Sequence, residues 1–404
     1  MSEPYQPLFN RTYLQIVMWL SAFAVLYLAT MGSQEPDYLE LNRAEKHPIY
    51  WVENESEQTN LAVLLPTGGA LTRSEKQLQT LLSQVLENQM AAQILPEGIE
   101  YQLQQAPDQL ILTFQWKDQD NLPDWSSLFS GLLSPIEASR WLPVLEKLKA
   151  RDYLQSHKTN NQLLNSYFQQ LTGGELNDPL ALLNSRYQRM LNNARFFISG
   201  NDSDELAEQL MEHPPRLAPT TRPDRNIARS QQEKILPSGN ERRYHLLVGA
   251  EIPVRNSADF IVHKLAAHTL QTALAQTSTS LKFEYRQLWS SLEDVGYRAL
   301  LLHADQPLDN LMQALENQIT PELAENSRNQ VINQWRERMT DERNQISALQ
   351  QVAFYGLPAD TLNTYSERMG SVEISDIVKL AKASVQPDNQ IRIRLANRTS
   401  ANQE

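Results

Sequence analysis

The sequence predicts an α+β protein in which two tandem α+β domains, each an antiparallel sheet backed by helices, follow one N-terminal transmembrane helix. Three observations support this prediction. The same order of strand and helix patterns occurs twice, a proline-rich segment separates the two occurrences, and a long uncharged apolar run lies near the N-terminus. A repeated order of elements is typical of a tandem duplication.

Composition limits the classes of function. The chain has 404 residues, of which 41% are hydrophobic and 21% charged, as in globular proteins with extensive cores. Its net charge of -12 disfavours nucleic acid as a partner, because phosphate binding requires a concentrated positive surface. The absence of cysteine excludes disulfides, thiol nucleophiles and cysteine-ligated metal.

The apolar run from Tyr13 to Met31 carries no charge and is long enough to cross a hydrocarbon core of roughly 30 Å. Arg11 precedes it, and acidic residues follow it at Glu35 and Asp37. The positive-inside bias then places residues 1–11 in the cytoplasm as a tail, with an anchor at 12–32 and a tether at 33–48. We therefore expect a single-pass protein of the inner, cytoplasmic membrane. Residues 13–31 would contact the membrane, and the C-terminal bulk would lie in the periplasm.

Two alternatives remain for this run. A cleaved signal peptide usually has a shorter apolar core and a small-x-small cleavage site, of which Ala29-Thr30-Met31 is a poor version. A buried core helix is rarely apolar on every face. Length and flanking charges favour an uncleaved anchor.

The first predicted domain spans residues 49–212. A strand-like run is ended by proline and a Gly-Gly turn, and helix, strand pair, helices, strand and helix follow. The corresponding ranges are Thr59–Leu65, Arg73–Ile94, Ile99–Gln104, Gln109–Trp116, Trp125–Gln170, Ala181–Asn192, Ala194–Gly200 and Ser203–Glu212.

Residues 213–242 form the proline-rich segment, which predicts a linker or a surface strap because proline removes backbone donors. The second predicted domain spans 243–397, and a tail occupies 398–404. The strands and helices expected in this second domain follow the same order as those of the first domain. Their ranges are Arg243–Pro253, Ala258–Ala275, Phe283–Leu288, Gly296–His303, Leu308–Gln318, Pro321–Phe354, Ser375–Ala383 and Asn389–Leu395.

Several stretches carry a resemblance to a known family. Leu182–Asn201 has the pattern of a helix followed by a short strand that ends in glycine. Asp294–Ile319 has the pattern of a strand followed by a helix, and Phe354–Val385 has the pattern of a helix, a loop and a short helix. With the duplicated layout, they resemble the insulinase/pitrilysin, or processing-peptidase-like, zinc metallopeptidases over most of residues 50–397. The resemblance implies tandem α+β domains and a zinc site on the first helix of the first domain.

In that family two histidines of an H-x-x-E-H motif hold zinc, the glutamate activates a water, and a downstream carboxylate is the third ligand. The best superposition places Gln84, Glu87 and Asn88 at the histidine, glutamate and histidine positions. Amides are poor zinc ligands compared with imidazole. Glu146 and Asp152 are the candidates for the distal carboxylate. We therefore predict that this degenerate motif is not catalytic, that the chain has no metal site and that it needs no cofactor.

In the second domain, active relatives carry an arginine and a tyrosine that grip the substrate. Tyr285 and Arg286 are the candidates here, although Arg286 is one place off the pattern. The helix that would bear the arginine is expected to be shortened, with Gln276–Ser280 in its place. His263 and His268 are spaced i, i+5, which does not bring both to one helix face.

Together with the anchor predicted from residues 13–31, the resemblance implies a membrane-anchored pseudopeptidase that acts as a non-catalytic partner subunit or as a scaffold for peptides or proteins. Its protein partner would be an active metallopeptidase of the same family, and an extended peptide could add to an open sheet edge. The alternative is an active zinc-dependent endopeptidase with an atypical metal site built around Glu87. A structural factor of the cell envelope that retains only the fold is a third reading.

Overall fold

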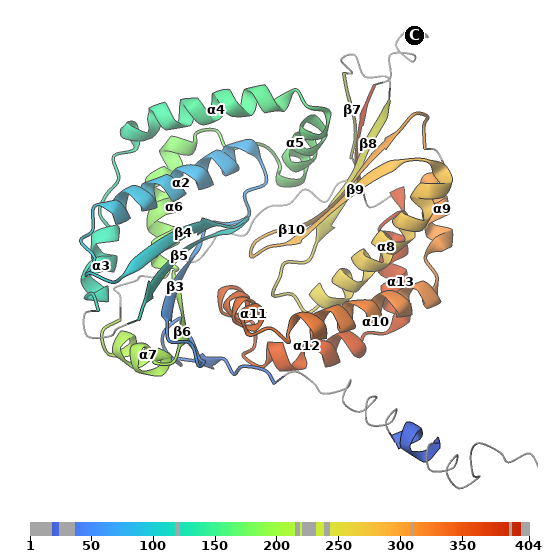
Figure 1. Cartoon of the computed structure of the whole chain (residues 1–404). Helices are drawn as coiled ribbons and strands as arrows, with labels where there is room; N and C mark the ends of the chain where they lie inside the picture. The colour runs from blue at the N-terminus through green and yellow to red at the C-terminus, as the bar shows by residue number, and fades with distance from the viewer. Residues whose placement is uncertain are drawn as a thin grey trace, which may run out of the picture.

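The computed structural model describes residues 18–23, 37–117, 122–214, 219, 232–237, 243–308, 310–387 and 390–396. Two α+β halves face each other across a shared boundary (Figure 1). The predicted tails at 1–11 and 398–404 lie outside the described residues. Most of the predicted membrane span lies outside them as well, and its described part, 18–23, is helical and exposed. Within the described residues, no helix combines the length and the apolar character that a membrane crossing needs.

The first half contains a six-stranded sheet in the order β1-β2-β6-β3-β5-β4. Its elements, in chain order, are β1 (Asn42–Arg43), β2 (Ile49–Glu53), β3 (Thr59–Pro66), α2 (Arg73–Ala91), β4 (Glu100–Gln105), β5 (Gln109–Trp116), α3 (Trp125–Leu132), a 3-10 turn (Ala138–Trp141), α4 (Leu142–Ser156), α5 (Thr159–Thr172), α6 (Pro179–Asn192), β6 (Arg195–Gly200) and α7 (Ser203–Glu212).

The second half contains a five-stranded sheet in the order β7-β11-β8-β10-β9. Its elements are β7 (Gln232–Leu236), β8 (Tyr244–Ile252), α8 (Phe260–Leu281), β9 (Glu284–Ser291), β10 (Gly296–Ala304), α9 (Leu311–Gln318), α10 (Pro321–Arg338), α11 (Glu342–Tyr355), α12 (Thr361–Gly370), α13 (Ile374–Ala383) and β11 (Ile391–Leu395).

The duplication is visible in the strand orders. Without β1, the first sheet reads β2-β6-β3-β5-β4, and the second sheet repeats this order strand for strand as β7-β11-β8-β10-β9. In both halves the first strand of the repeat pairs in parallel with the last one, β2 with β6 and β7 with β11. Both sheets are therefore mixed and not antiparallel as predicted. The segment expected to be a linker, 213–242, contains β7.

Two helical predictions also need correction. The predicted helix Pro321–Phe354 is divided into α10 and α11, because Asp341 begins a new helix by accepting a hydrogen bond from the backbone N–H of Arg343 at 2.8 Å. Gln276–Ser280 is not a replacement for a shortened helix but the last part of α8. There the Thr277 hydroxyl donates to the carbonyl of Ala273 at 2.8 Å, within the helix.

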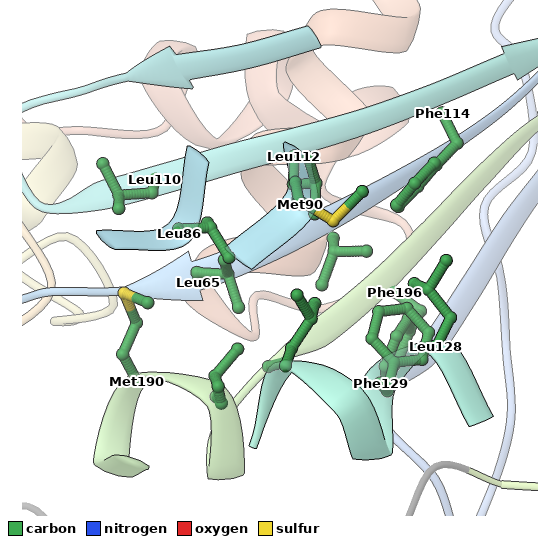
Figure 2. Packing of buried hydrophobic residues seen from close by; sticks show 14 of the residues in the cluster. Leu65, Leu86, Met90, Leu110, Leu112, Phe114, Leu128, Phe129, Met190 and Phe196 are labelled. Carbon is green, nitrogen blue, oxygen red and sulfur yellow. The ribbon is translucent and has the colours of Figure 1, made fainter. Parts of the chain in front are cut away.

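Each sheet has its own helices on one face. In the first half the helices α2, α3 and α6 pack on β3, β5 and β6 through buried apolar side chains, several of which are labelled in Figure 2. The second half has an equivalent core between β8, β10 and the helices α8, α9, α10, α12 and α13. Alternation along β5, where Leu110, Leu112 and Phe114 are buried, matches the period of a strand with one face in the core.

The opposite face of each sheet is covered by a helix from the other half. From the first half, α5 packs Leu163, Tyr167 and Leu171 against β8, β10 and β11. In return, α11 packs Leu349 and Phe354, with other apolar residues, against the first sheet. Each half therefore completes the core of the other.

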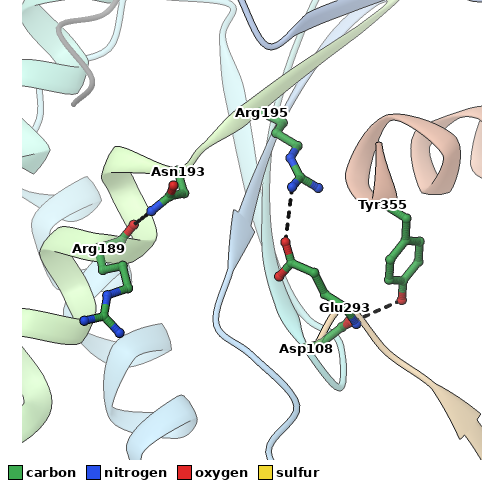
Figure 3. Close-up of polar contacts among 6 residues, drawn as sticks. All are labelled: Asp108, Arg189, Asn193, Arg195, Glu293 and Tyr355. Atoms are coloured by element: carbon green, nitrogen blue, oxygen red, sulfur yellow. Dashed lines mark hydrogen bonds and ion pairs between the residues drawn. The ribbon is translucent and has the colours of Figure 1, made fainter. Parts of the chain in front are cut away.

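A polar junction joins the halves beside this apolar contact (Figure 3). The carboxylate of Asp108 accepts hydrogen bonds from the backbone N–H of Glu293 at 2.9 Å and from the Tyr355 hydroxyl at 3.1 Å. The Glu293 carboxylate pairs with the Arg195 guanidinium at 3.1 Å. These contacts fix the relative position of the β4–β5 turn, the β9–β10 turn and α11.

Candidate functional site

The helix α2 is the element on which the sequence places the candidate site, and its start is fixed by a capping box. The Thr72 hydroxyl accepts from the N–H of Glu75 at 3.4 Å, and the Glu75 carboxylate accepts from the N–H of Thr72 at 2.9 Å. Just before it, the N–H of Gly69 donates to Asp294 at 2.8 Å, and a Cβ at Gly69 would lie 2.5 Å from Val295. The start of α2 therefore lies against the second half.

A polar hollow of about 240 Å³ lies between the first turns of α2, the end of α4 and the start of α5. Its central contact is a 2.8 Å hydrogen bond from the Gln77 amide to the Asp152 carboxylate. Basic and amide side chains make up most of the remaining wall, namely Arg73, Lys76, Arg151, Gln155, Asn161 and Asn165, with Thr80 and Ser156.

The structure does not bring the predicted motif residues together with a distal carboxylate. Gln84 is half-buried, and Glu87 and Asn88 are exposed. Asp152 contacts α2 at Gln77, seven residues before Gln84, which corresponds to about 10 Å along a helix. Glu146, the other candidate, is exposed and pairs with Lys149 at 3.0 Å.

The part of α2 that faces Asp152 has its own triplet at the i, i+3, i+4 spacing of an H-x-x-E-H motif. The three residues are Arg73, Lys76 and Gln77. Two of them are cations and the third is an amide that already donates to Asp152, so none is suited to bind a divalent cation. Neither position on α2 therefore offers a zinc ligand set.

The candidates in the second half also do not converge. Tyr285 packs at the edge of the second core, whereas Arg286 is exposed. Adjacent residues of a strand point to opposite faces of the sheet, so the two side chains lie on different sides of β9. Burial lowers the pKa of His263 and of His268, which favours neutral imidazoles. His268 lies 3.4 Å from the Gln330 amide.

Across the part of the chain that the structure describes, no three His, Asp or Glu side chains are grouped so that they could hold a metal ion. The polar hollow around Gln77 and Asp152 was not predicted from the sequence. A sequence signal for it exists in the Thr72-x-x-Glu75 capping box. The box fixes where α2 begins and so places Arg73, Lys76 and Gln77 in its first turns.

The comparison with solved structures finds relatives over nearly the whole chain. A crystal structure of a peptidase M16 inactive domain from Pseudomonas fluorescens superimposes with a TM-score of 0.63 at 11% identity, covering 88% of this chain and 97% of that one. A protease from Helicobacter pylori superimposes with a TM-score of 0.64 at 11% identity, covering 90% and 100%. The chain has the M16 peptidase fold.

A further match comes from a structure of complex III2. A chain of complex III2 from Candida albicans, solved with Inz-5 bound, superimposes with a TM-score of 0.57 at 15% identity and covers 89% of this chain and 95% of its own. No family model and no curated protein matches at the level of sequence. The resemblance to insulinase/pitrilysin peptidases is thus confirmed as a likeness of fold.

Proposed function

We propose that this chain is a non-catalytic protein of the M16 fold that serves as a partner subunit or as a binding scaffold. One observation carries the proposal. Arg73, Lys76 and Gln77 lie at the spacing of the metal motif on the face of α2 that meets Asp152 of α4. The side-chain amide of Gln77 donates a hydrogen bond to the carboxylate of Asp152.

Zinc chemistry explains why this arrangement argues against catalysis. The metal needs imidazole or anionic ligands, and a guanidinium at position 73 offers no lone pair to bind it. Glu87 is exposed on the surface of α2. The glutamate of this motif removes a proton from a metal-bound water, which then attacks the peptide bond. Without the metal no such water is activated, and the glutamate has no catalytic role.

Two features support a binding role. Similar solved structures include a peptidase M16 inactive domain and a chain of complex III2, so the fold occurs in a domain described as inactive and within a complex. In addition, β4 and β9 are the terminal strands of their sheets. An extended peptide can add to such an edge through backbone hydrogen bonds alone, without any catalytic group.

The proposed partner is an active metallopeptidase of the same fold that retains H-x-x-E-H. We place the pair at the inner membrane of a bacterial cell, held by residues 13–31, with the two α+β halves in the periplasm. This placement rests on the uncharged run and its flanking charges.

Affinity purification of the full chain from detergent-solubilised membranes at native expression tests the proposal. We expect one companion chain with an intact H-x-x-E-H to be recovered in roughly equal amount. A parallel preparation without the 12–32 segment tests the membrane placement, because it should fractionate with soluble protein. Recovery of the full chain as a lone monomer under several mild detergents would contradict the partner role.

A further inference from the structure

A second hollow, of about 390 Å³, lies within the second half, between the start of α8 and the helices α10, α11 and α12. It is separate from α2 and from the sheet edges considered above. Its volume is in the range of pockets that bind small molecules. The sequence analysis assigned it no role.

The charge of this hollow is opposite to that of the protein. Four cationic side chains contribute to its wall, and no Asp or Glu does. The cations are Arg255, Lys264, Arg338 and Arg368. Over the whole chain acidic residues outnumber basic ones, 48 to 36, so a wall with four cations and no carboxylate departs from the average surface.

These cations are not neutralised by neighbouring carboxylates. Within the described residues, none of the four belongs to an ion pair. Instead the Arg255 guanidinium lies 3.9 Å from the ring centre of Phe260, and Lys264 donates to the Tyr365 hydroxyl at 3.0 Å. Neither contact places a carboxylate beside Arg255 or Lys264, so both side chains can also pair with an incoming anion.

The same wall carries aromatic and aliphatic side chains, and the planes of its two neighbouring rings, Trp335 and Tyr365, are inclined by 53°. The rings of Trp335 and Tyr365 are 4.5 Å apart between centres, and Phe260, Ile261 and Leu362 extend the apolar area. The indole N–H of Trp335 is buried and has no hydrogen-bond acceptor among the described residues. A ligand that brings an acceptor to this N–H would satisfy a donor that folding leaves unpaired.

We propose that this hollow binds a small organic anion, a molecule with a carboxylate or similar charged group attached to a flat apolar body. The charged group pairs with the arginines and Lys264, and the apolar body lies against Trp335 and Tyr365. Arg338 and Arg368 are exposed at the rim, which suits them to attract an anion from solvent.

Isothermal titration of the full chain in a nonionic detergent, with 1-naphthoate as the probe, tests this proposal. We expect one naphthoate site per chain, at least tenfold weaker binding of the uncharged analogue 1-naphthamide, and at least tenfold weaker naphthoate binding by the double variant Arg338→Gln/Arg368→Gln. A tenfold change in affinity corresponds to about 1.4 kcal/mol. Because both arginines are exposed, the variant should keep its unfolding midpoint.

A matched control removes two charges elsewhere. Lys147→Gln/Lys379→Gln changes the net charge equally at exposed positions of α4 and α13 that do not line the hollow, and it should bind naphthoate within about twofold of the unchanged protein. Absence of naphthoate binding at millimolar concentration would overturn the proposal. Equal binding by the arginine variant, equal binding of naphthamide, or an equal loss in the lysine control would overturn it as well.

Discussion

Asp108 is a buried carboxylate at the junction of the two halves, and its side chain is 1% exposed. Burial raises its pKa to about 6, against the opposing effect of hydrogen bonds from Glu293 and Tyr355. Between pH 4 and 6 the folded protein therefore holds a proton here that the unfolded chain, with an ordinary carboxyl, has released. Because the folded pKa is raised, this group stabilises the fold at low pH, and the contribution is lost as pH rises through about 6.

Replacing this carboxylate should remove that dependence. We expect Asp108→Asn to flatten the pH profile of the free energy of unfolding between pH 4 and 7, by on the order of 3 kcal/mol relative to the unchanged protein. Denaturant titrations at a series of pH values measure the difference. Asp360→Asn, at an exposed position, is the control for loss of one charge. Parallel profiles for the unchanged protein and Asp108→Asn would contradict the assignment.

Gly249 of β8 is a position where two parts of the molecule approach closely. A Cβ there would lie 2.5 Å from the ring of Tyr167 in α5, whose hydroxyl donates to the carbonyl of Arg298 at 2.8 Å. The absence of a side chain at 249 lets α5 of the first half reach the second sheet. Neither sequence segment alone reveals this requirement, because the partners are far apart in the chain.

Gly249→Ala should therefore destabilise the protein by roughly 1–3 kcal/mol, because the added methyl group displaces the Tyr167 ring or the strand. The free energy of unfolding in urea is the measurement. Gly370→Ala is the matched control, since a Cβ at 370 meets nothing within 4 Å. If both variants were equally stable, α5 would not pack on the second sheet in this way.

At the level of elements, the helix breaks and caps explain much of the architecture. α10 ends at Arg338, and Asp341 caps the start of α11, the helix that covers the first sheet. One turn later, the Gln345 amide accepts from the N–H of Leu39 at 2.8 Å and donates to the carbonyl of Asp37 at 3.0 Å. The cap of α11 thereby also positions the chain that enters the first half.

We expect Asp341→Ala to cost about 1 kcal/mol through loss of this cap. Hydrogen exchange should quicken in the first turn of α11 and at residues 37–39, while α10 is unchanged. Asp360→Ala is a suitable control, because Asp360 precedes α12 without a side-chain capping bond. Equal exchange in the two variants would show that Asp341 does not hold α11 in place.

Element order could be predicted from the sequence, but sheet pairing could not. The alternation along β5 and the short continuous apolar run of β3, which Pro66 ends, identify these strands. β2 and β7 are five residues long and lie in polar or proline-rich surroundings, and they are strands because β6 and β11 pair with them from a distance in sequence. The loss of histidine on α2 was evident in the sequence, whereas the contact of Gln77 with Asp152 depends on how α4 packs.

At the scale of the whole molecule, the halves exchange helices and form one body. α5 covers the second sheet and α11 covers the first, so separating the halves would expose residues such as Leu171 and Leu349 that are fully buried. Each such side chain contributes about 1.5–3 kcal/mol when buried. These apolar contacts thus stabilise the duplicated M16 fold across its boundary.

Zinc content and peptide cleavage, measured together on the full chain purified without chelators, test the central claim most directly. We expect far less than one zinc per chain and no cleavage of unstructured peptides above background, with no change on adding zinc or in the Glu87→Gln variant. One tightly held zinc per chain, together with peptide cleavage that Glu87→Gln abolishes, would contradict the claim and favour an active endopeptidase with an atypical metal site.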